Sequence, residues 1–242
     1  MEEKYKTVKK YIGLALYTPI LVFYYYISKT YDTIYSNSSS TSEEFLNLKY
    51  FGGFYFTGWN FSGQVYFLVV AVADELTILT GLSTLTNKII TTVRHYLFTA
   101  IVFPSTVLVG VLFWSLYVMD RELVFPQSLD EFYPAWITHS VHSFVVVPLI
   151  IEINLPKEQD YDIVEFQKAL PILTAFVVCY QTALIAVYFL HDVWLYPLFK
   201  FISWFQRILL LEMLYCMTVV FLYVGIYLQH LKRQLTDTKF SY

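Results

Sequence analysis

The apolar run YLFTAIVFPSTVLVGVLFWSLYVM, residues 96–119, decides the fold class of this chain. It contains 24 residues and no Asp, Glu, Lys or Arg, whereas about 20 apolar residues in a helix cross the hydrocarbon layer of a bilayer. Similar runs recur on both sides of it, and the predicted spans are 11–28, 54–73, 96–119, 136–153, 170–190 and 203–229. We therefore predict an all-α polytopic membrane protein, a bundle of six transmembrane helices.

The composition agrees with a chain that lies mostly in lipid. Of its 242 residues, 57% are hydrophobic and 14% are charged, whereas about a quarter of a soluble domain is charged. We expect one transmembrane domain over residues 1–242, because few residues remain for another. The net charge of −3 and the scattered basic residues argue against a nucleic-acid partner. Cys179 and Cys216 lie in apolar runs, which predicts buried thiols without a disulfide or zinc framework.

The distribution of Lys and Arg predicts the orientation. With the N-terminus in the cytoplasm, the cytoplasmic segments carry 11 of these residues and the opposite side carries 4. Because cytoplasmic loops are enriched in positive charge, both termini are expected in the cytoplasm. The polar segment 36–44 would then form a flexible exoplasmic loop that includes the glycosylation sequon at Asn37.

Polar residues form a stripe along the second predicted span. Thr57, Asn60 and Gln64 are offset by three and seven positions, which places them on one helical face. Gly58 and Gly63 flank the stripe and permit close approach of another helix. The stripe is explained either by hydrogen bonds between packed helices or by a functional site.

Two histidines begin the fourth predicted span. His139 and His142 are three positions apart and share a face, and the topology places His142 at the depth of Thr57. A hydroxyl beside an imidazole is the minimum set for nucleophilic catalysis, because the base removes the proton during attack. Alternatively, His139, His142 and His191 together suit zinc, and His139 alone suits a hydrogen bond to a neighbouring helix.

Charged residues follow the third predicted span as Asp120-Arg121-Glu122. Charges at the end of a membrane helix ordinarily form a solvated rim. Arg121 is also the residue here that suits the carboxylate of a lipid, because its guanidinium can bind a carboxylate through two hydrogen bonds.

The order of these motifs resembles one known family of membrane proteins. The motifs that carry the resemblance are Phe56-Thr57, Asn60, Gln64, Phe67, Phe103-Pro104, Phe113-Trp114, Tyr117, Asp120-Arg121-Glu122, Pro126, Phe132, Pro134, Trp136, His139, His142, Pro148, Glu152, Trp194-Leu195-Tyr196-Pro197 and Arg207. The chain resembles the family of the androgen-induced gene one and androgen-dependent TFPI-regulating proteins over roughly residues 50–210. The resemblance implies a six-span hydrolase acting on fatty acid esters of hydroxy fatty acids.

The resemblance also implies which residues act. In that family a threonine of an early span is the nucleophile, and the second histidine of a His-x-x-His segment is the base. Carried to this sequence, these are Thr57 and His142. The segment before Trp194 departs from the family pattern, so His191 inherits no role.

The sequence and the resemblance together predict an intramembrane lipid esterase without a cofactor or a metal. Its expected partners are a lipid ester and membrane lipids, and the endoplasmic reticulum is its expected location, because lipid enzymes concentrate there. The expected site residues are Thr57 as nucleophile, His142 as base, Asn60 or Gln64 as oxyanion donors, His139 as pocket support and Arg121 as the group that binds a substrate carboxylate. The alternatives are a metal-dependent membrane hydrolase and a non-enzymatic lipid-binding or scaffold protein.

Overall fold

The computed structural model describes residues 2–80, 84–155 and 163–239, and this part of the chain contains helices and no strand. The helices long and apolar enough to cross a membrane are Tyr11–Asn37, Phe56–Thr80, Thr86–Leu123, Ala135–Asn154, Phe166–His191 and Trp204–Leu235. The prediction of an all-α protein with six such helices is confirmed, and the protein is a multi-pass integral membrane protein.

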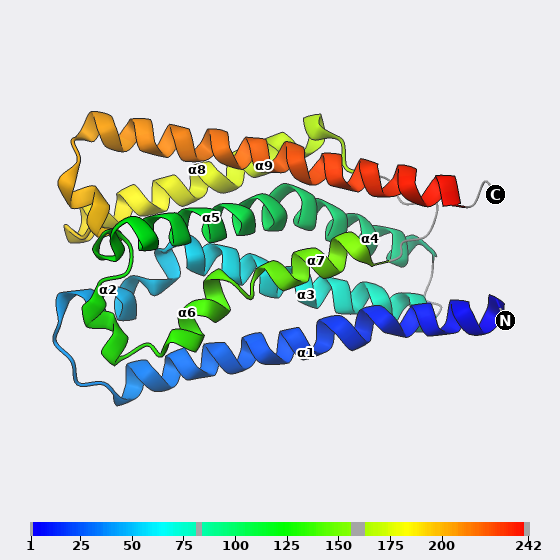
Figure 1. Ribbon diagram of the computed structural model, residues 1–242, viewed down its shortest axis with the longest axis horizontal. Helices are drawn as coiled ribbons and strands as arrows, with labels where there is room; N and C mark the ends of the chain where they lie inside the picture. Colours follow the sequence, from blue (N-terminus) through cyan, green and yellow to red (C-terminus); the bar gives the residue numbers. More distant parts are fainter. Residues whose placement is uncertain (1, 81–83, 156–162, 240–242) are drawn as a thin grey trace.

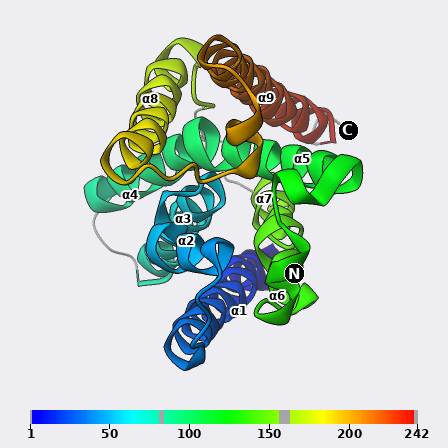
Figure 2. The same ribbon diagram turned by 90° about the vertical axis from the view of Figure 1, so that its left-hand side faces the viewer.

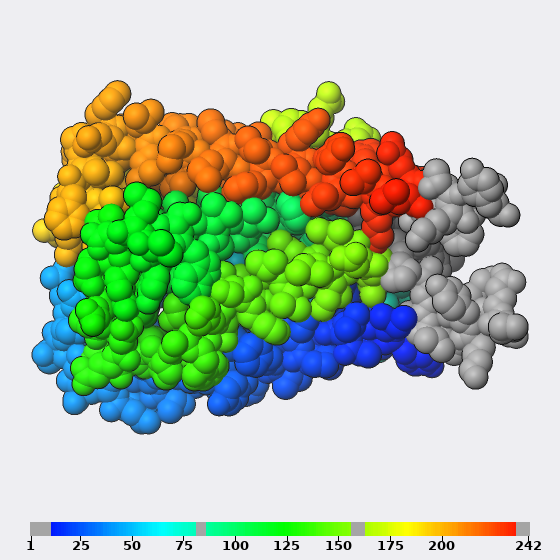
Figure 3. All heavy atoms as spheres, viewed as in Figure 1, coloured from blue at the N-terminus to red at the C-terminus, as the bar shows by residue number. Residues whose placement is uncertain are grey.

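The helices form three groups that lie side by side (Figures 1 and 2). The helices of nine or more residues, together with the short α6, are α1 (Glu2–Asn37), α2 (Glu43–Phe51), α3 (Phe56–Thr80), α4 (Thr84–Leu97), α5 (Phe103–Asp120), α6 (Ala135–His142), α7 (Val146–Asn154), α8 (Phe166–His191) and α9 (Trp204–Lys239). Helices α4 and α5 cross the middle of the molecule, with α8 and α9 on one side and α1, α3, α6 and α7 on the other. In the space-filling view, α6 and α7 fill the band between α1 and α5 (Figure 3).

Both termini lie at one end of the bundle, and short helical turns gather at the opposite end (Figure 1). These turns are η1 (Gly52–Phe54), η3 (Arg121–Leu123), η4 (Gln127–Glu131) and η5 (Pro197–Phe201). Together with α2 they surround the candidate site described below.

The third span is continuous but contains a wide turn. The π-helical turn η2 (Phe98–Val102) joins α4 to α5, and the Phe103 N–H bonds to the carbonyl of Phe98. Pro104 follows directly and has no N–H to give to the carbonyl four residues earlier, which explains the irregular turn at this point. The turn precedes Ser105 and Thr106, whose buried hydroxyls face α3.

The fourth span is broken between α6 and α7. Pro148 lies in the first turn of α7 and cannot donate to the Phe144 carbonyl four residues earlier, so the regular ladder cannot run through this point. The Phe144 carbonyl instead accepts a hydrogen bond from the N–H of Val147 at 2.9 Å. The Phe144 N–H reaches back five residues to His139, also at 2.9 Å. The break thus falls directly after His142.

Several elements differ from the sequence-based expectations. Segment 36–44 is not wholly a loop, because α1 continues to Asn37 and α2 begins at Glu43. The Ser42 side chain accepts a hydrogen bond from the Phe45 N–H and so caps α2. The prediction of buried thiols was also wrong, since Cys179 and Cys216 are exposed on the outer faces of α8 and α9.

A buried cluster of charged side chains joins four helices on the terminal side of the bundle. Arg94 of α4 is 4% exposed and lies 2.8 Å from Asp74, 3.0 Å from Glu75 and 2.7 Å from Glu152. Tyr17 of α1 accepts a hydrogen bond from Arg94 at 3.0 Å and donates one to Glu152. Since buried charges need partners, this cluster fixes α1, α3, α4 and α7 relative to one another.

Candidate active site

Thr57 and His142 are in direct contact. Thr57 lies in the first turn of α3, and His142 is the last residue of α6. The distance between Thr57 Oγ1 and His142 Nε2 is 3.2 Å, which is within hydrogen-bond range. The structure therefore brings together two residues that are 85 positions apart in the chain.

The second ring nitrogen of His142 determines what Nε2 can do. His142 Nδ1 lies 2.9 Å from the backbone carbonyl oxygen of Thr138, which can only accept a hydrogen bond. Neutral imidazole has a single N–H, so that N–H belongs on Nδ1. The Nε2 lone pair then faces the Thr57 hydroxyl, which is the arrangement that a general base needs.

The imidazole of His142 is held on its face as well as at its edges. Its ring stacks on Phe113 of α5, with centroids 3.4 Å apart and an interplanar angle of 11°. His142 is 7% exposed. This packing and the hydrogen bond to Thr138 restrict the ring to one orientation.

Contacts around the beginning of α3 fix the position of Thr57. The phenol oxygen of Tyr196 accepts a hydrogen bond from the Phe56 N–H at 2.9 Å. A Cβ on Gly58 would lie 2.7 Å from the carbonyl oxygen of Gly52, so only glycine permits this close approach of α3 to η1. The N–H groups of Thr57 and Gly58 lie in the first helical turn, where amides have no acceptor within the helix.

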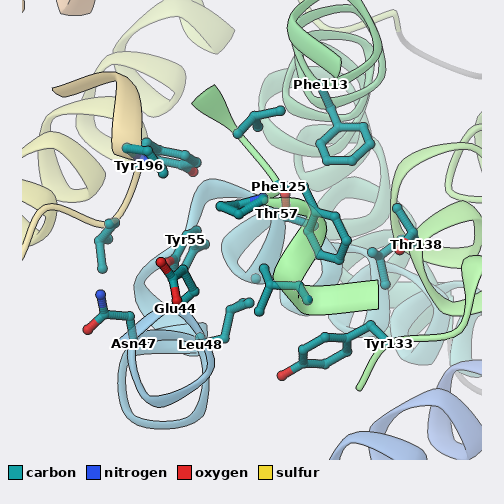
Figure 4. A pocket seen from close by; sticks show the side chains of 18 of the residues that line it. Glu44, Asn47, Leu48, Tyr55, Thr57, Phe113, Phe125, Tyr133, Thr138 and Tyr196 are labelled. Atoms are coloured by element: carbon teal, nitrogen blue, oxygen red, sulfur yellow. The ribbon is translucent and has the colours of Figure 1, made fainter. Parts of the chain in front are cut away.

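A cavity of about 810 Å³ opens onto the Thr57–His142 pair from the end of the bundle opposite to the termini. Its volume is within the range of small-molecule and cofactor sites. Figure 4 shows Thr57 between two groups of lining side chains, which are Phe113, Phe125 and Thr138 on one side and Tyr55 and Tyr196 on the other. The wall is therefore mainly aromatic near the hydroxyl, which suits an apolar ligand.

The inner wall is uncharged, and charges lie among the residues nearer the mouth. Burial raises the pKa of the Tyr55, Tyr133 and Tyr196 phenols, so these groups stay protonated at physiological pH. The ammonium group of Lys200 donates to Glu43 at 2.8 Å and lowers the pKa of that carboxyl. The two residues join α2 to η5 across the cavity.

Asn60 and Gln64 follow Thr57 along α3, but their amides are used differently. Asn60 Oδ1 accepts hydrogen bonds from Ser105 at 2.9 Å and Thr106 at 2.8 Å. Asn60 Nδ2 is buried and has no hydrogen-bond partner in the described part of the chain. The Gln64 amide donates to Thr106 at 2.7 Å and to the Val145 carbonyl at 2.8 Å. Gln64 therefore has no donor left for an oxyanion, whereas Asn60 has one.

The structure does not gather the histidines of the metal-site alternative. His139 is exposed, lies 3.3 Å from the Ser143 hydroxyl and stacks on Trp114, away from the Thr57 hydroxyl. His191 packs against Phe51, with ring centroids 5.0 Å apart. Within residues 2–80, 84–155 and 163–239, no three His, Cys, Asp or Glu side chains converge in the way that a metal ion requires.

Arg121 is engaged by other parts of the chain. Its guanidinium forms a two-pronged ion pair with Asp130, at 2.9 and 2.6 Å, and its Nε donates to the Phe125 carbonyl. Its charge also lies 4.9 Å from the centre of the Tyr117 ring. Arg121 thus holds η3 against η4 and is not among the residues that line the cavity.

Sequence reasoning assigned no role to three residues that hold the pair in place, Thr138, Phe113 and Tyr196, although Phe113 and Tyr196 are among the motifs that carry the resemblance. Thr138 lies four residues before His142, so helical spacing could have indicated it. Phe113 and Tyr196 come from distant parts of the chain, and no periodicity connects them with Thr57.

The fold and the site together define a six-helix integral membrane protein in which a half-buried threonine and a buried histidine, in contact with each other, line a cavity. The chain belongs to the FAR-17a/AIG1-like protein family, whose model matches residues 14–230.

Curated relatives agree with this membership. The chain is 28% identical to the androgen-dependent TFPI-regulating protein of Mesocricetus auratus over 168 residues, which are 69% of this chain and 71% of that protein. It is 31% identical to the protein of the same name from Mus musculus over 139 residues, 57% of this chain and 58% of that protein. It is 28% identical to the androgen-induced gene 1 protein of Homo sapiens over 163 residues, 62% and 67% of the two chains. No solved structure matches the chain.

Proposed function

We propose that this protein is an intramembrane lipid ester hydrolase with Thr57 as its nucleophile and His142 as its general base. The observation that carries the proposal is the contact of 3.2 Å between Thr57 Oγ1 and His142 Nε2, combined with the bond from Nδ1 to the Thr138 carbonyl. A hydroxyl, a base and a group that orients the base are the parts that nucleophilic hydrolases share.

In the first half of the reaction, Thr57 Oγ1 attacks the carbonyl carbon of the ester while His142 Nε2 takes the hydroxyl proton. A tetrahedral intermediate forms and then collapses, and the bond between the carbonyl carbon and the alkoxy oxygen breaks. His142 returns the proton to the departing oxygen, so the free alcohol leaves and the acyl group stays on Thr57.

In the second half, water attacks the acyl carbon and gives a proton to His142 Nε2. The fatty acid then departs, and the proton returns to Thr57 Oγ1. As donors to the oxyanion we propose the first-turn N–H groups of Thr57 and Gly58, together with Asn60 Nδ2, which lies one turn further along α3 and has no hydrogen-bond partner in the described part of the chain. In a site with mainly apolar walls, such donors contribute more than they do in solution.

For the substrate, we propose a fatty acid ester of a hydroxy fatty acid or a related lipid ester. The support is the resemblance to hydrolases of such esters, the aromatic wall and a volume of about 810 Å³ that accommodates part of an acyl chain. We also propose the endoplasmic reticulum as the location, because enzymes of lipid metabolism concentrate there.

The first experiment is labelling of the detergent-purified protein with a fluorophosphonate, followed by peptide mass spectrometry. We expect an adduct on Thr57, and we expect Thr57→Ala and His142→Ala each to lower labelling and ester hydrolysis by about 1,000-fold or more. Thr57→Ser keeps the hydroxyl and should retain labelling. Thr182→Ala is the matched control, because the Thr182 hydroxyl on α8 bonds to the Val178 carbonyl of its own helix and to no other group in the part of the chain that the structure describes.

The same assay separates this proposal from the alternatives. Labelling and hydrolysis should be unchanged by EDTA, whereas loss on chelation would favour the metal-dependent reading. Folded wild-type protein that is inert to both the probe and lipid esters would overturn the proposed activity and favour a lipid-binding role.

A further inference from the structure

The break between α6 and α7 leaves the base of the proposed reaction at the end of an interrupted helix. From Ser143 to Val145 the backbone follows no regular helix, and the Val146 N–H bonds back only three residues to Ser143. A continuous hydrogen-bond ladder would fix His142 relative to α7, but here the ladder is interrupted. Something outside the fourth span must therefore hold the junction.

A side chain of α3 holds it. Gln64 Nε2 donates to the carbonyl oxygen of Val145 at 2.8 Å, and Val145 is the N-cap residue directly before α7. Val145 and Gln64 are both fully buried. Since the non-helical stretch from Ser143 to Val145 is only three residues long, the bond from Gln64 to Val145 fixes the backbone close to His142.

The Gln64 amide is oriented by two further bonds. Tyr24 of α1 donates its hydroxyl proton to Gln64 Oε1, and Gln64 Nε2 also donates to Thr106 of α5 at 2.7 Å. The Gln64 amide has only one possible orientation, because its oxygen accepts from Tyr24 and its nitrogen donates both of its protons. Both protons of the amide nitrogen are therefore donated, one to α5 and one to the junction.

We propose that Gln64 is a positioning residue that holds His142 in register with Thr57 by clamping the junction between α6 and α7. Gln64 lies seven residues after Thr57 on the same face of α3, so nucleophile and clamp belong to one rigid element. Near the break, the helix of the nucleophile and the span of the base are then joined by two hydrogen-bonding contacts, the one between Thr57 and His142 and the one from Gln64 to Val145. This inference rests on the proposed function.

The test compares two chemically identical substitutions. Gln64→Met removes the clamp and keeps a side chain of similar length. Gln181→Met removes another glutamine bond to a backbone carbonyl, the one from α8 to Leu211 of α9 at 3.2 Å, which touches neither the α3 helix nor the fourth span. The readouts are the rate of fluorophosphonate labelling at Thr57, kcat and KM for a lipid ester, and thermal unfolding in detergent.

We expect Gln64→Met to slow labelling and kcat by about 10- to 100-fold with KM nearly unchanged, because a displacement of about 1 Å at the reacting atoms has an effect of this size. Gln181→Met should label at the wild-type rate. The effect should also depend on His142, so adding Gln64→Met to His142→Ala should slow the residual labelling no further. A general loss of structure would slow both backgrounds alike.

Each outcome decides between the two claims. If the wild type is labelled and Gln64→Met is labelled equally fast, the clamp is overturned and the proposed function is left intact. The same holds if Gln64→Met slows labelling equally in the wild-type and the His142→Ala backgrounds. Wild type that is never labelled overturns the proposed function and the clamp with it. Should Gln64→Met fail to fold, Gln64→Glu retains the size and the acceptor for Tyr24 while it loses the amide donor, and it should show the same slowing.

Discussion

The imidazole of His142 is oriented by a peptide carbonyl, where many hydrolases use a carboxylate. The Thr138 carbonyl fixes the tautomer as a carboxylate would, because it accepts from Nδ1 at 2.9 Å. It carries only a partial charge, however, so it stabilises the transient imidazolium less. The oxyanion donors must then supply a larger share of the catalysis in the proposed reaction.

Asn60 is the side chain at which the contribution of the oxyanion donors to catalysis should be measurable. We predict that Asn60→Ala lowers kcat by about 100-fold or more while KM changes little, because a donor to the oxyanion acts mainly in the transition state. Steady-state kinetics with a lipid ester measures both quantities. The control is Asn154→Ala, since among the described residues the Asn154 amide bonds to the Ile150 carbonyl of its own helix alone. An unchanged kcat in the Asn60 variant would remove this residue from the proposed oxyanion site.

At this scale the sequence indicated some contacts and could not indicate others. The helical offsets of Thr57, Asn60 and Gln64 placed them on one face, and the structure agrees. The offsets could not show that Gln64 gives its protons to α5 and α7, because that depends on where a break in another helix falls. The role of Arg121 was likewise hidden, since Asp130 reaches it only through the fold of the η3–η4 segment.

At the scale of the element, Pro148 determines the shape of the fourth span. Without an N–H it cannot extend the ladder from α6, and the break places His142 at a helix end, where its side chain can turn toward α3. The third span shows the same principle in a milder form. Pro104 there accompanies a π-helical turn and leaves the span continuous.

We predict that Pro148→Ala lowers activity without lowering stability. The new N–H can bond to the Phe144 carbonyl and continue the helix, so thermal unfolding in detergent should occur at the same or a higher temperature. Labelling of Thr57 should fall by about tenfold or more, because a straightened span moves His142. Pro171→Ala in α8 is the matched control and should leave labelling unchanged. If Pro148→Ala is labelled as fast as wild type, the break does not position the base.

Hydropathy found the spans but not the full helices. All six spanning helices of the structure extend past at least one predicted boundary, for example Thr86–Leu123 against 96–119. Apolar runs report how much of a helix lies in lipid, whereas the helix itself continues as long as backbone hydrogen bonds and caps allow. The same limit hid α2, which is too short and too polar for a span and is marked in the sequence only by its cap, Ser42.

At the scale of the whole molecule, two polar centres tie the same helices together at different depths. One is the candidate site, where α3 meets the fourth span, and the other is the Arg94 cluster, where α3 meets that span again through Glu152 of α7. Apolar contacts alone do not specify the depth of one membrane helix against another, since lipid is as apolar as the helix surface. Directional bonds at two depths do specify it.

We predict that Arg94→Met destabilises the protein severely. It leaves the buried Asp74, Glu75 and Glu152 without their shared cation, and breaking a buried ion pair in this way costs about 3–5 kcal/mol. The measurement is thermal unfolding in detergent together with resistance to proteolysis. Arg94→Lys should recover part of the loss, because it keeps the charge but reaches fewer partners. Exposed Arg233→Met is a control for loss of a positive charge, and equal unfolding temperatures for the two Met variants would contradict the prediction.

The fold class was predictable at this scale because membrane helices are set by length and apolarity, which the sequence displays directly. The placement of both termini in the cytoplasm stays a prediction from the Lys and Arg count. The Arg94 cluster was not predicted, since its members come from separate helices and no spacing in the sequence connects them.

The cavity opens at one end of the bundle, and both chain termini lie at the other. In a membrane-spanning arrangement these two ends face opposite sides of the bilayer. The proposed hydrolase would therefore bind its ester from a single leaflet. Its two products would be released into that same leaflet, and lipid in the other one would have to flip before it could react. A protein tag at either terminus would stand on the far side of the bilayer and leave the mouth of the cavity unobstructed.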